Sequence, residues 1–131
     1  MGSPFYMDPT LLKAYRISNK KAIYSKKYDV WGLGVLCCQL LTGKGPFNST
    51  GIDDLINKIE NGDYSLPINF SEETMSFINA MLQYDRDKRS SIDELLKHDF
   101  LNKTISEFTK INPKNYFIVD SKIKMNIKKK V

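Results

Sequence analysis

Few side chains in this sequence combine into a recognisable chemical site. His98 is the only histidine, and Cys37 and Cys38 are the only cysteines. Adjacent cysteines make an awkward disulfide and lack the spacing of a metal site. Because they lie inside an apolar run, we expect both to be small buried hydrophobic residues in a reducing compartment. No GxxxxGK[ST] loop occurs either, so the sequence predicts no metal site and no cofactor site in these 131 residues.

The charge of the chain is unevenly distributed. Its formal net charge is +5, yet residues 1–101 hold twelve basic and thirteen acidic side chains, whereas residues 102–131 hold eight lysines and two acidic residues. We expect one globular domain over residues 1–101 and a basic, mostly flexible tail over 102–131. A lysine-rich tail can touch nucleic acid, acidic lipid or an acidic partner. A run of charge is more commonly a solvated surface, which is the interpretation we favour.

No targeting or membrane-spanning segment is expected. Residues 1–15 lack the continuous apolar core of a signal peptide, and the longest apolar stretch, residues 30–41, is too short to cross a bilayer. Gly2 stands where myristoylation requires it, but Tyr6 replaces the serine or threonine of that signal. We therefore expect a cytoplasmic protein.

The hydrophobic pattern predicts an all-α fold. Residues 29–43, DVWGLGVLCCQLLTG, are apolar on nearly every side, which is typical of a helix in the middle of a core, and Gly43 is a natural stop. Residues 52–61 have helical apolar spacing and end at Gly62. Ser71 and Ser91 are expected N-caps of two further helices, and Glu94 completes a capping box with Ser91.

The remaining elements are less regular. Residues 11–14 are expected to form a short helical turn, and the polar residues 15–28 a surface loop. Residues 2–10, GSPFYMDPT, contain two prolines and an aromatic pair, which indicates a stiff, ordered loop. The expected apolar faces of the last two helices are Met75, Ile78, Met81 and Leu82 in one, and Ile92, Leu95 and Leu96 in the other.

Four stretches together resemble the C-terminal large lobe of a eukaryotic serine/threonine protein kinase domain. GSPFYMDPT resembles the GTxxYMAPE end of the activation segment, and DVWGLG resembles the D-x-W-S-x-G start of the central helix. TGKGPF resembles the G-x-x-PF loop, and DRDKRSSIDELLKHDFL resembles the segment that ends the domain. The resemblance covers residues 2–101 and implies an incomplete protein-kinase-like fold, with a central apolar helix and packed amphipathic helices.

The resemblance implies roles for single residues. Ser3, Pro4 and Tyr6 would belong to a substrate-facing loop. The structural residues of the family motifs would be Pro9, Asp29, Trp31, Gly34 and Arg89. Asp29 would hold the catalytic-loop backbone in the family, but the alternative of a helix N-cap is the one we favour here. Ser3 is interpreted as a plain turn residue, and Trp31 as part of the core.

One departure from the family concerns Arg89. In the family this arginine pairs with the glutamate of A-P-E, which reads Asp8-Pro9-Thr10 here. Thr10 cannot form an ion pair, and a buried arginine without a partner is unfavourable. Either Asp8 reaches Arg89 from two positions away, or Arg89 turns to solvent, and both alternatives predict looser packing. Gly32 in place of serine and a longer loop from Leu11 to Tyr28 are further departures.

The implied activity is transfer of the ATP γ-phosphate to a protein serine or threonine. The sequence contains no Gly-rich phosphate loop, V-A-I-K lysine, H-R-D-x-x-x-x-N segment or D-F-G, although phosphoryl transfer needs these to hold ATP and Mg²⁺. We therefore expect no catalytic residue in this chain, which would be an inactive, truncated large lobe. An exposed central helix would make it marginally stable, and either prone to aggregation or dependent on a partner.

Two alternatives differ in class from a kinase. The first is a pseudokinase-like scaffold or protein-binding module, and the relaxed Asp8-Pro9-Thr10 motif favours it. In either case the helix at 52–61 would dock a protein substrate or partner, although it can equally be an ordinary amphipathic helix. The second alternative is an unrelated helical domain that binds nucleic acid. It is weaker, because the aromatic residues are not interleaved with basic ones.

Overall fold

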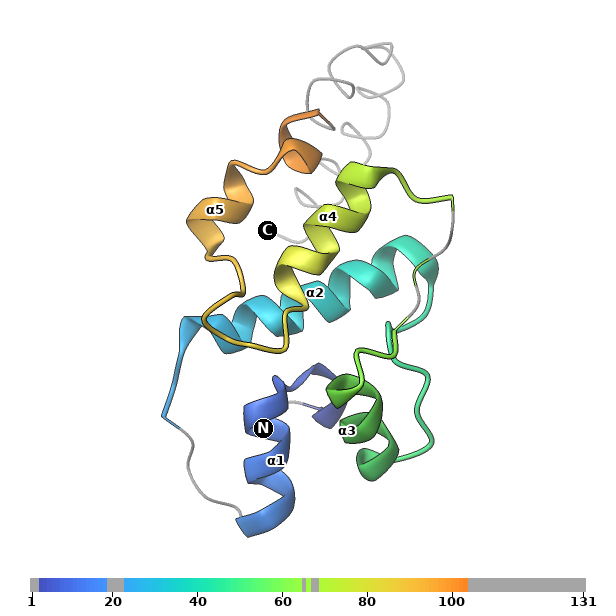
Figure 1. Cartoon of the computed structure of the whole chain (residues 1–131), viewed down its shortest axis with the longest axis vertical. Helices are drawn as coiled ribbons and strands as arrows, with labels where there is room; N and C mark the ends of the chain where they lie inside the picture. The colour runs from blue at the N-terminus through green and yellow to red at the C-terminus, as the bar shows by residue number, and fades with distance from the viewer. Residues whose placement is uncertain (1–2, 19–22, 65, 67–68, 104–131) are drawn as a thin grey trace, which may run out of the picture. The chain divides into compact units, whose positions relative to one another are not determined.

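The computed structural model describes residues 3–18, 23–64, 66 and 69–103. The chain divides into two units, Met1–Leu96 and Lys97–Val131. The first unit contains a short 3-10 helix, η1 (Pro4–Tyr6), and five α-helices (Figure 1). These helices are α1 (Pro9–Ser18), α2 (Lys26–Thr42), α3 (Ile52–Glu60), α4 (Glu72–Met81) and α5 (Ile92–Leu96). No strand occurs in the described residues, so the all-α prediction is confirmed.

The central helix α2 begins earlier than predicted. Ser25 is its N-cap, because the Ser25 hydroxyl accepts a hydrogen bond from the Lys27 amide at 3.2 Å. The interpretation of Asp29 as the N-cap is therefore wrong, and Asp29 lies within the first turn. The helix ends as predicted at Gly43, whose φ of 76° is left-handed. Gly43 donates its amide to the Gln39 carbonyl at 2.8 Å.

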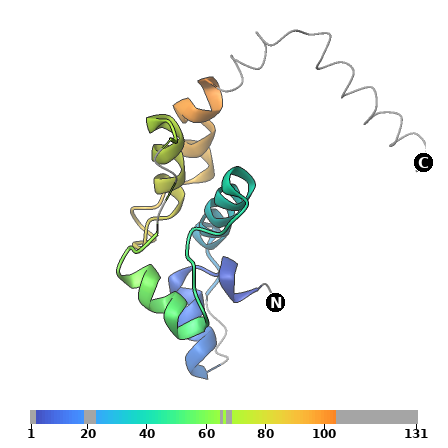
Figure 2. The ribbon, with the colours of Figure 1, turned by 90° about the vertical axis from the view of Figure 1, so that its right-hand side faces the viewer.

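Only one side of α2 is buried by the described residues. Figure 2 shows α4 on one side of α2 and no α-helix of the first unit on the opposite side. The buried residues of α2 are Tyr28, Val30, Trp31, Gly34, Val35 and Cys38, and the exposed leucines are Leu33, Leu36, Leu40 and Leu41. The expectation of a helix buried on every side is therefore wrong for this chain. The expectation that part of this apolar surface is exposed is confirmed.

Gly34 allows α2 and α4 to approach closely. A Cβ atom built at Gly34 would lie 2.8 Å from Met81 Cβ and 2.9 Å from Leu82 Cδ2. From α4 and its C-cap, Phe77, Met81 and Leu82 are buried. Met75 is 38% exposed, so its predicted place on the apolar face is wrong, and Phe77 takes that role.

The segment after the opening loop is more helical than predicted. Asp8 caps α1, because its carbonyl accepts from the Leu12 amide at 2.9 Å and its Oδ1 accepts from the Thr10 amide at 2.7 Å. Pro9 then occupies the first helical position, where its missing N–H has no intrahelical partner to lose. The helix continues to Ser18. The expected four-residue turn and the expected long loop were therefore wrong, and residues 19–22 of that loop lie outside the described residues.

The predicted caps of the later helices are confirmed. Gly62 has a φ of 63° and donates its amide to the Ile59 carbonyl, as in a Schellman motif. Ser71 Oγ accepts from the Thr74 amide at 3.2 Å. Ser91 and Glu94 form a reciprocal capping box, with contacts of 2.7 and 3.2 Å. In α5, however, only Leu95 is buried, whereas Ile92 and Leu96 are exposed, so the three-residue apolar face was wrong.

The core gathers around Trp31. Its ring stacks on Phe47 with a centroid distance of 6.0 Å, and Phe47 meets Tyr64 edge-on at 5.7 Å. The prediction that Trp31 lies in the core is confirmed. Among the residues that the structure describes, no helix has the length and apolar character needed to cross a membrane.

Candidate functional site

The loop expected to face substrate is fixed on the surface of α2. Its η1 turn is closed by hydrogen bonds from the Tyr6 amide to the Ser3 carbonyl and from the Met7 amide to the Pro4 carbonyl. The Tyr6 hydroxyl donates to Gln39 Oε1. A Cβ atom at Gly32 would lie only 3.3 Å from the Tyr6 carbonyl oxygen. Tyr6 therefore contacts α2 at two points that are about two helical turns apart.

Asp8 and Arg89 form a buried ion pair next to this loop. Arg89 Nη1 lies 2.5 Å from Asp8 Oδ2, and both side chains are fully buried. The first alternative, in which Asp8 reaches Arg89 from two positions away, is confirmed. The alternative with Arg89 in solvent is wrong, whereas the looser packing that we expected stays a prediction. Asp8 Oδ1 accepts from the Thr10 amide, so the second carboxylate oxygen, Oδ2, is the one that faces Arg89.

Arg89 also donates hydrogen bonds to two backbone carbonyls. Nε and Nη2 both donate to the Gln83 carbonyl, at 3.1 and 2.8 Å, and Nη1 donates to the Lys27 carbonyl at 2.6 Å. The guanidinium lies 5.0 Å from the centre of the Trp31 ring, a cation–π arrangement. Arg89 thus connects the start of α1, the first turn of α2 and the turn before α5. The ion pair with Asp8 and these three hydrogen bonds to backbone carbonyls offset part of the desolvation penalty of the buried guanidinium.

Asp29 lies on the exposed side of α2. The Tyr24 hydroxyl donates to Asp29 Oδ2 at 2.5 Å. This hydrogen bond, followed by the charge of the carboxylate, raises the pKa of Tyr24. Spacing of four, three and four residues places Asp29 on one face with Leu33, Leu36 and Leu40, and all four are exposed. The free face of α2 is therefore an apolar stripe with one carboxylate at its N-terminal end.

The helix predicted to dock partners, α3, already makes contacts within the domain. Leu55, Ile56 and Ile59 bury its apolar face in the core. Helix α3 lies side by side with α1 (Figure 1), and its Asp53 pairs with Arg16 of α1. Glu60 pairs with Lys13. The hydrogen bond to Glu60, with a smaller effect of Tyr84, raises the pKa of Lys13. Docking on this helix stays a prediction, and it would have to use polar side chains.

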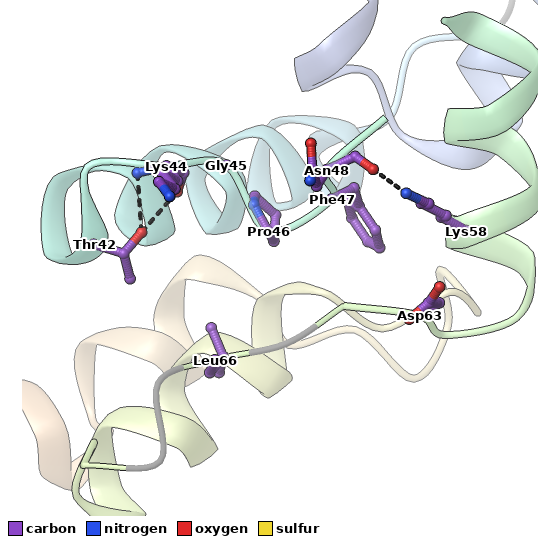
Figure 3. A pocket seen from close by; sticks show the side chains of 9 residues that line it. All are labelled: Thr42, Lys44, Gly45, Pro46, Phe47, Asn48, Lys58, Asp63 and Leu66. Carbon is purple, nitrogen blue, oxygen red and sulfur yellow. Dashed lines mark hydrogen bonds between the residues drawn. The ribbon is translucent and has the colours of Figure 1, made fainter. Parts of the chain in front are cut away.

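A broad groove of about 830 Å³ lies beneath the 43–48 loop (Figure 3). Thr42 and Lys44 lie at one end, and Phe47 and Lys58 at the other. Lys58 Nζ donates to the Asn48 carbonyl and lies 3.6 Å from an Asp54 carboxylate oxygen. Part of the charge that faces this groove is therefore already used within the domain.

Side chains of the types that bind metal ions lie apart from one another in the residues that the structure describes. No three histidine, cysteine, aspartate or glutamate side chains gather in this part of the chain as a metal site would need. Cys38 is buried, Cys37 is half-buried, and both are free thiols. Burial, with the neighbouring Cys37, raises the pKa of Cys38 to about 11, so that it stays a thiol at neutral pH. His98 Nδ1 accepts from the Phe100 amide at 3.1 Å, which is a local structural contact.

The arrangement of η1, α2 and the buried ion pair can be compared with known proteins. The family model described as the protein kinase domain matches residues 1–101. This chain belongs to the protein kinase family. Members of this family use ATP and Mg²⁺, and the 131 residues contain part of such a domain.

Curated relatives of this kinase chain are serine/threonine kinases. A probable serine/threonine-protein kinase of Dictyostelium discoideum is 35% identical over 112 residues, which cover 86% of this chain and 13% of the relative. Putative serine/threonine-protein kinase A of Trypanosoma brucei brucei is 35% identical over 121 residues, which cover 92% and 26%. Probable serine/threonine-protein kinase HSL1 of Saccharomyces cerevisiae is 34% identical over 102 residues, which cover 78% and 6%. The chain thus spans about a quarter or less of these kinases.

The structure brings together some of the residues expected in the kinase site and separates others. Arg89, Trp31 and the Asp8–Pro9 junction form one cluster, whereas Asp29 lies on the exposed side of α2 and contacts Tyr24. The sequence interpretation overlooked Gln39, which holds Tyr6. A signal was available, because Gln39 is the one polar residue between Val30 and Leu41 apart from the glycines and cysteines.

Proposed function

We propose that this chain is the substrate-side part of a serine/threonine protein kinase that phosphorylates protein serine or threonine. The observation that carries the proposal is the buried Asp8–Arg89 pair, because it fixes the junction after Ser3, Pro4 and Tyr6 against α2. A loop that must present a protein substrate needs such fixed support. In this proposal residues 1–101 form the kinase part, residues 102–131 form a basic tail, and the protein is cytoplasmic.

The catalytic groups of the proposed kinase lie outside these 131 residues, and this chain alone is inactive. The free face of α2 supports this. Leu33, Leu36 and Leu40 form a continuous exposed apolar stripe, with Leu40 77% exposed. Stripes of this kind are usually covered by another part of the protein or by a partner. ATP and Mg²⁺ would be held by the segment that covers it.

A pseudokinase-like scaffold is the second candidate. The same exposed stripe on α2 supports it, because a separate partner protein could cover the leucines without any catalysis. The Asp8-Pro9-Thr10 sequence no longer favours a scaffold, since Arg89 keeps a buried partner. The two candidates therefore differ in what covers α2.

Full-length transcripts that span the Met1 codon distinguish the two candidates. We expect the open reading frame to continue upstream in frame through a D-F-G segment and then an H-R-D segment, because a kinase needs both to bind Mg²⁺ and to orient the substrate hydroxyl. The measurement is long-read sequencing of the messenger RNA. In-frame stop codons directly upstream of Met1 in every transcript would contradict the kinase proposal and favour the scaffold.

A further inference from the structure

The free side of α2 carries three leucines at the spacing of a helix–helix contact. Leu33, Leu36 and Leu40, the leucine stripe, are 37%, 42% and 77% exposed. Spacings of three and four residues keep side chains on one face of a helix, and such a row is the seam along which two helices pack. No described α-helix of the first unit lies on this side of α2 (Figure 2). The leucine stripe is therefore open to a second helix.

The two ends of the leucine stripe carry opposite charges. Asp29 precedes Leu33 by four residues, Lys44 follows Leu40 by four residues, and both are exposed. Residues 30–43, which lie between them, contain no charged side chain. The Tyr24 hydroxyl donates to Asp29 Oδ2 at 2.5 Å, a hydrogen bond that leaves the negative charge of the carboxylate in place. The long, flexible side chain of Lys44 lets its ammonium group reach across the end of the helix.

This pattern is complementary to itself when two copies of α2 pack antiparallel. A two-fold axis through the middle of the leucine stripe lays the leucines of one copy against those of the other. It also brings Asp29 of each copy to the end where the other carries Lys44. In a parallel pair, aspartate would face aspartate and lysine would face lysine, which is unfavourable. The charges therefore favour the antiparallel direction.

We propose that two copies of this chain form an antiparallel dimer through the leucine stripe of α2, with an Asp29–Lys44 ion pair at each end. Burial of the exposed leucine surface supplies the driving force, and the charges set the direction. Because both copies use the same surface, the contact closes at two copies and does not grow further. The inference goes beyond the proposed function, since it concerns what covers α2 in the 131-residue chain itself. In a protein that also contains the catalytic segment, that segment and a second copy compete for the stripe.

Sedimentation equilibrium of the full 131-residue chain measures this association. We expect a monomer–dimer equilibrium with a Kd in the micromolar range, because three leucines from each copy bury a small area. Leu36→Glu should raise the Kd at least about tenfold, since it places a carboxylate from each copy in the apolar seam. Leu96→Glu is the matched control and should leave the Kd unchanged, because Leu96 is equally accessible to water but lies on α5.

Reversal of the two charges tests the antiparallel direction. Asp29→Lys alone and Lys44→Asp alone should each raise the Kd about tenfold, because the two-fold axis then brings like charges together at both ends of the dimer. The double variant, Asp29→Lys with Lys44→Asp, should return the Kd to within about twofold of the unmodified chain. A parallel dimer would respond to neither single reversal, since like charges already face each other in it.

The outcomes separate this inference from the proposed function. A monomer at every concentration up to about 100 µM would overturn the dimer and favour a cover for α2 from the same chain or from a different protein. Assemblies larger than a dimer, a Kd that Leu36→Glu leaves unchanged, or single charge reversals without effect would each overturn it as well. None of these results alters the transcript test of the kinase proposal. Far-UV circular dichroism and Trp31 fluorescence identify any variant that fails to fold, and the unmodified chain and the charge reversals then still decide the question.

Discussion

Asp8→Ala should lower the free energy of unfolding by about 3–5 kcal/mol. The substitution leaves the Arg89 guanidinium buried without its carboxylate, although the two side chains are fully buried in the unmodified chain. It also removes the cap of α1, because Asp8 Oδ1 accepts from the Thr10 amide, and such a loss alone is about 1 kcal/mol. A small domain is stable by only about 5–15 kcal/mol, so we expect much of the Asp8→Ala protein to unfold readily.

Urea unfolding measures this effect with a built-in reporter. Trp31 is the only tryptophan, and the Arg89 guanidinium lies 5.0 Å from its ring, so its fluorescence should change when Arg89 loses its position. Asp87→Ala is the matched control, since Asp87 is exposed, and it should change stability by less than about 0.5 kcal/mol. Asp8→Ala combined with Thr10→Glu should recover part of the loss, because the glutamate restores the family pairing. A loss below about 1 kcal/mol for Asp8→Ala would contradict the account.

Gly34→Ala should destabilise the domain by about 1–3 kcal/mol. Alanine is normally more favourable than glycine in a helix by about 1 kcal/mol. A loss of stability in Gly34→Ala would therefore be opposite to the effect of helix propensity. The reason is the contact with α4, where the new Cβ would lie 2.8 Å from Met81 Cβ. The new Cβ atom and Met81 Cβ are each bonded directly to the backbone of a helix. The helices must therefore move apart and lose packing.

Thermal and urea unfolding of Gly34→Ala can be compared with Gly32→Ala. Gly32 lies on the same helix, and its Cβ would be 3.3 Å from the Tyr6 carbonyl oxygen, a milder contact. We expect a clearly smaller effect there, because the gain in helix propensity offsets a small displacement of η1. If Gly34→Ala is neutral or stabilising, the close contact of α2 and α4 is not as tight as described.

Local signals in the sequence were sufficient for several parts of the fold. Gly43, Gly62, Ser71 and Ser91 end or begin helices as predicted, because a cap depends on residues three or four positions away. Features that depend on distant neighbours were harder to predict. The predicted start of α2 was wrong because Ser25 and Asp29 are both good capping residues. Only the packed structure selects Ser25.

The pairing of Arg89 shows more clearly what could not be predicted from the sequence alone. The sequence left Asp8 and solvent as alternatives, because the two residues are far apart in the chain and only the fold brings them to 2.5 Å. Which faces of α2, α4 and α5 are exposed also depends on residues that are distant in the chain. An apolar residue such as Met75 or Leu96 is compatible with burial, but whether a neighbouring element covers it is a property of the tertiary structure.

The central claim is that these 131 residues provide the substrate side of a kinase and no nucleotide site. Titration of the purified chain with ATP, with and without Mg²⁺, followed by thermal unfolding, tests it most directly, with a complete serine/threonine kinase domain as the positive control. We predict no heat of binding and no Mg²⁺-dependent shift of Tm, because no described group of side chains gathers to hold a metal ion. A clear Mg²⁺-dependent shift would contradict the claim and reveal a nucleotide site within this chain.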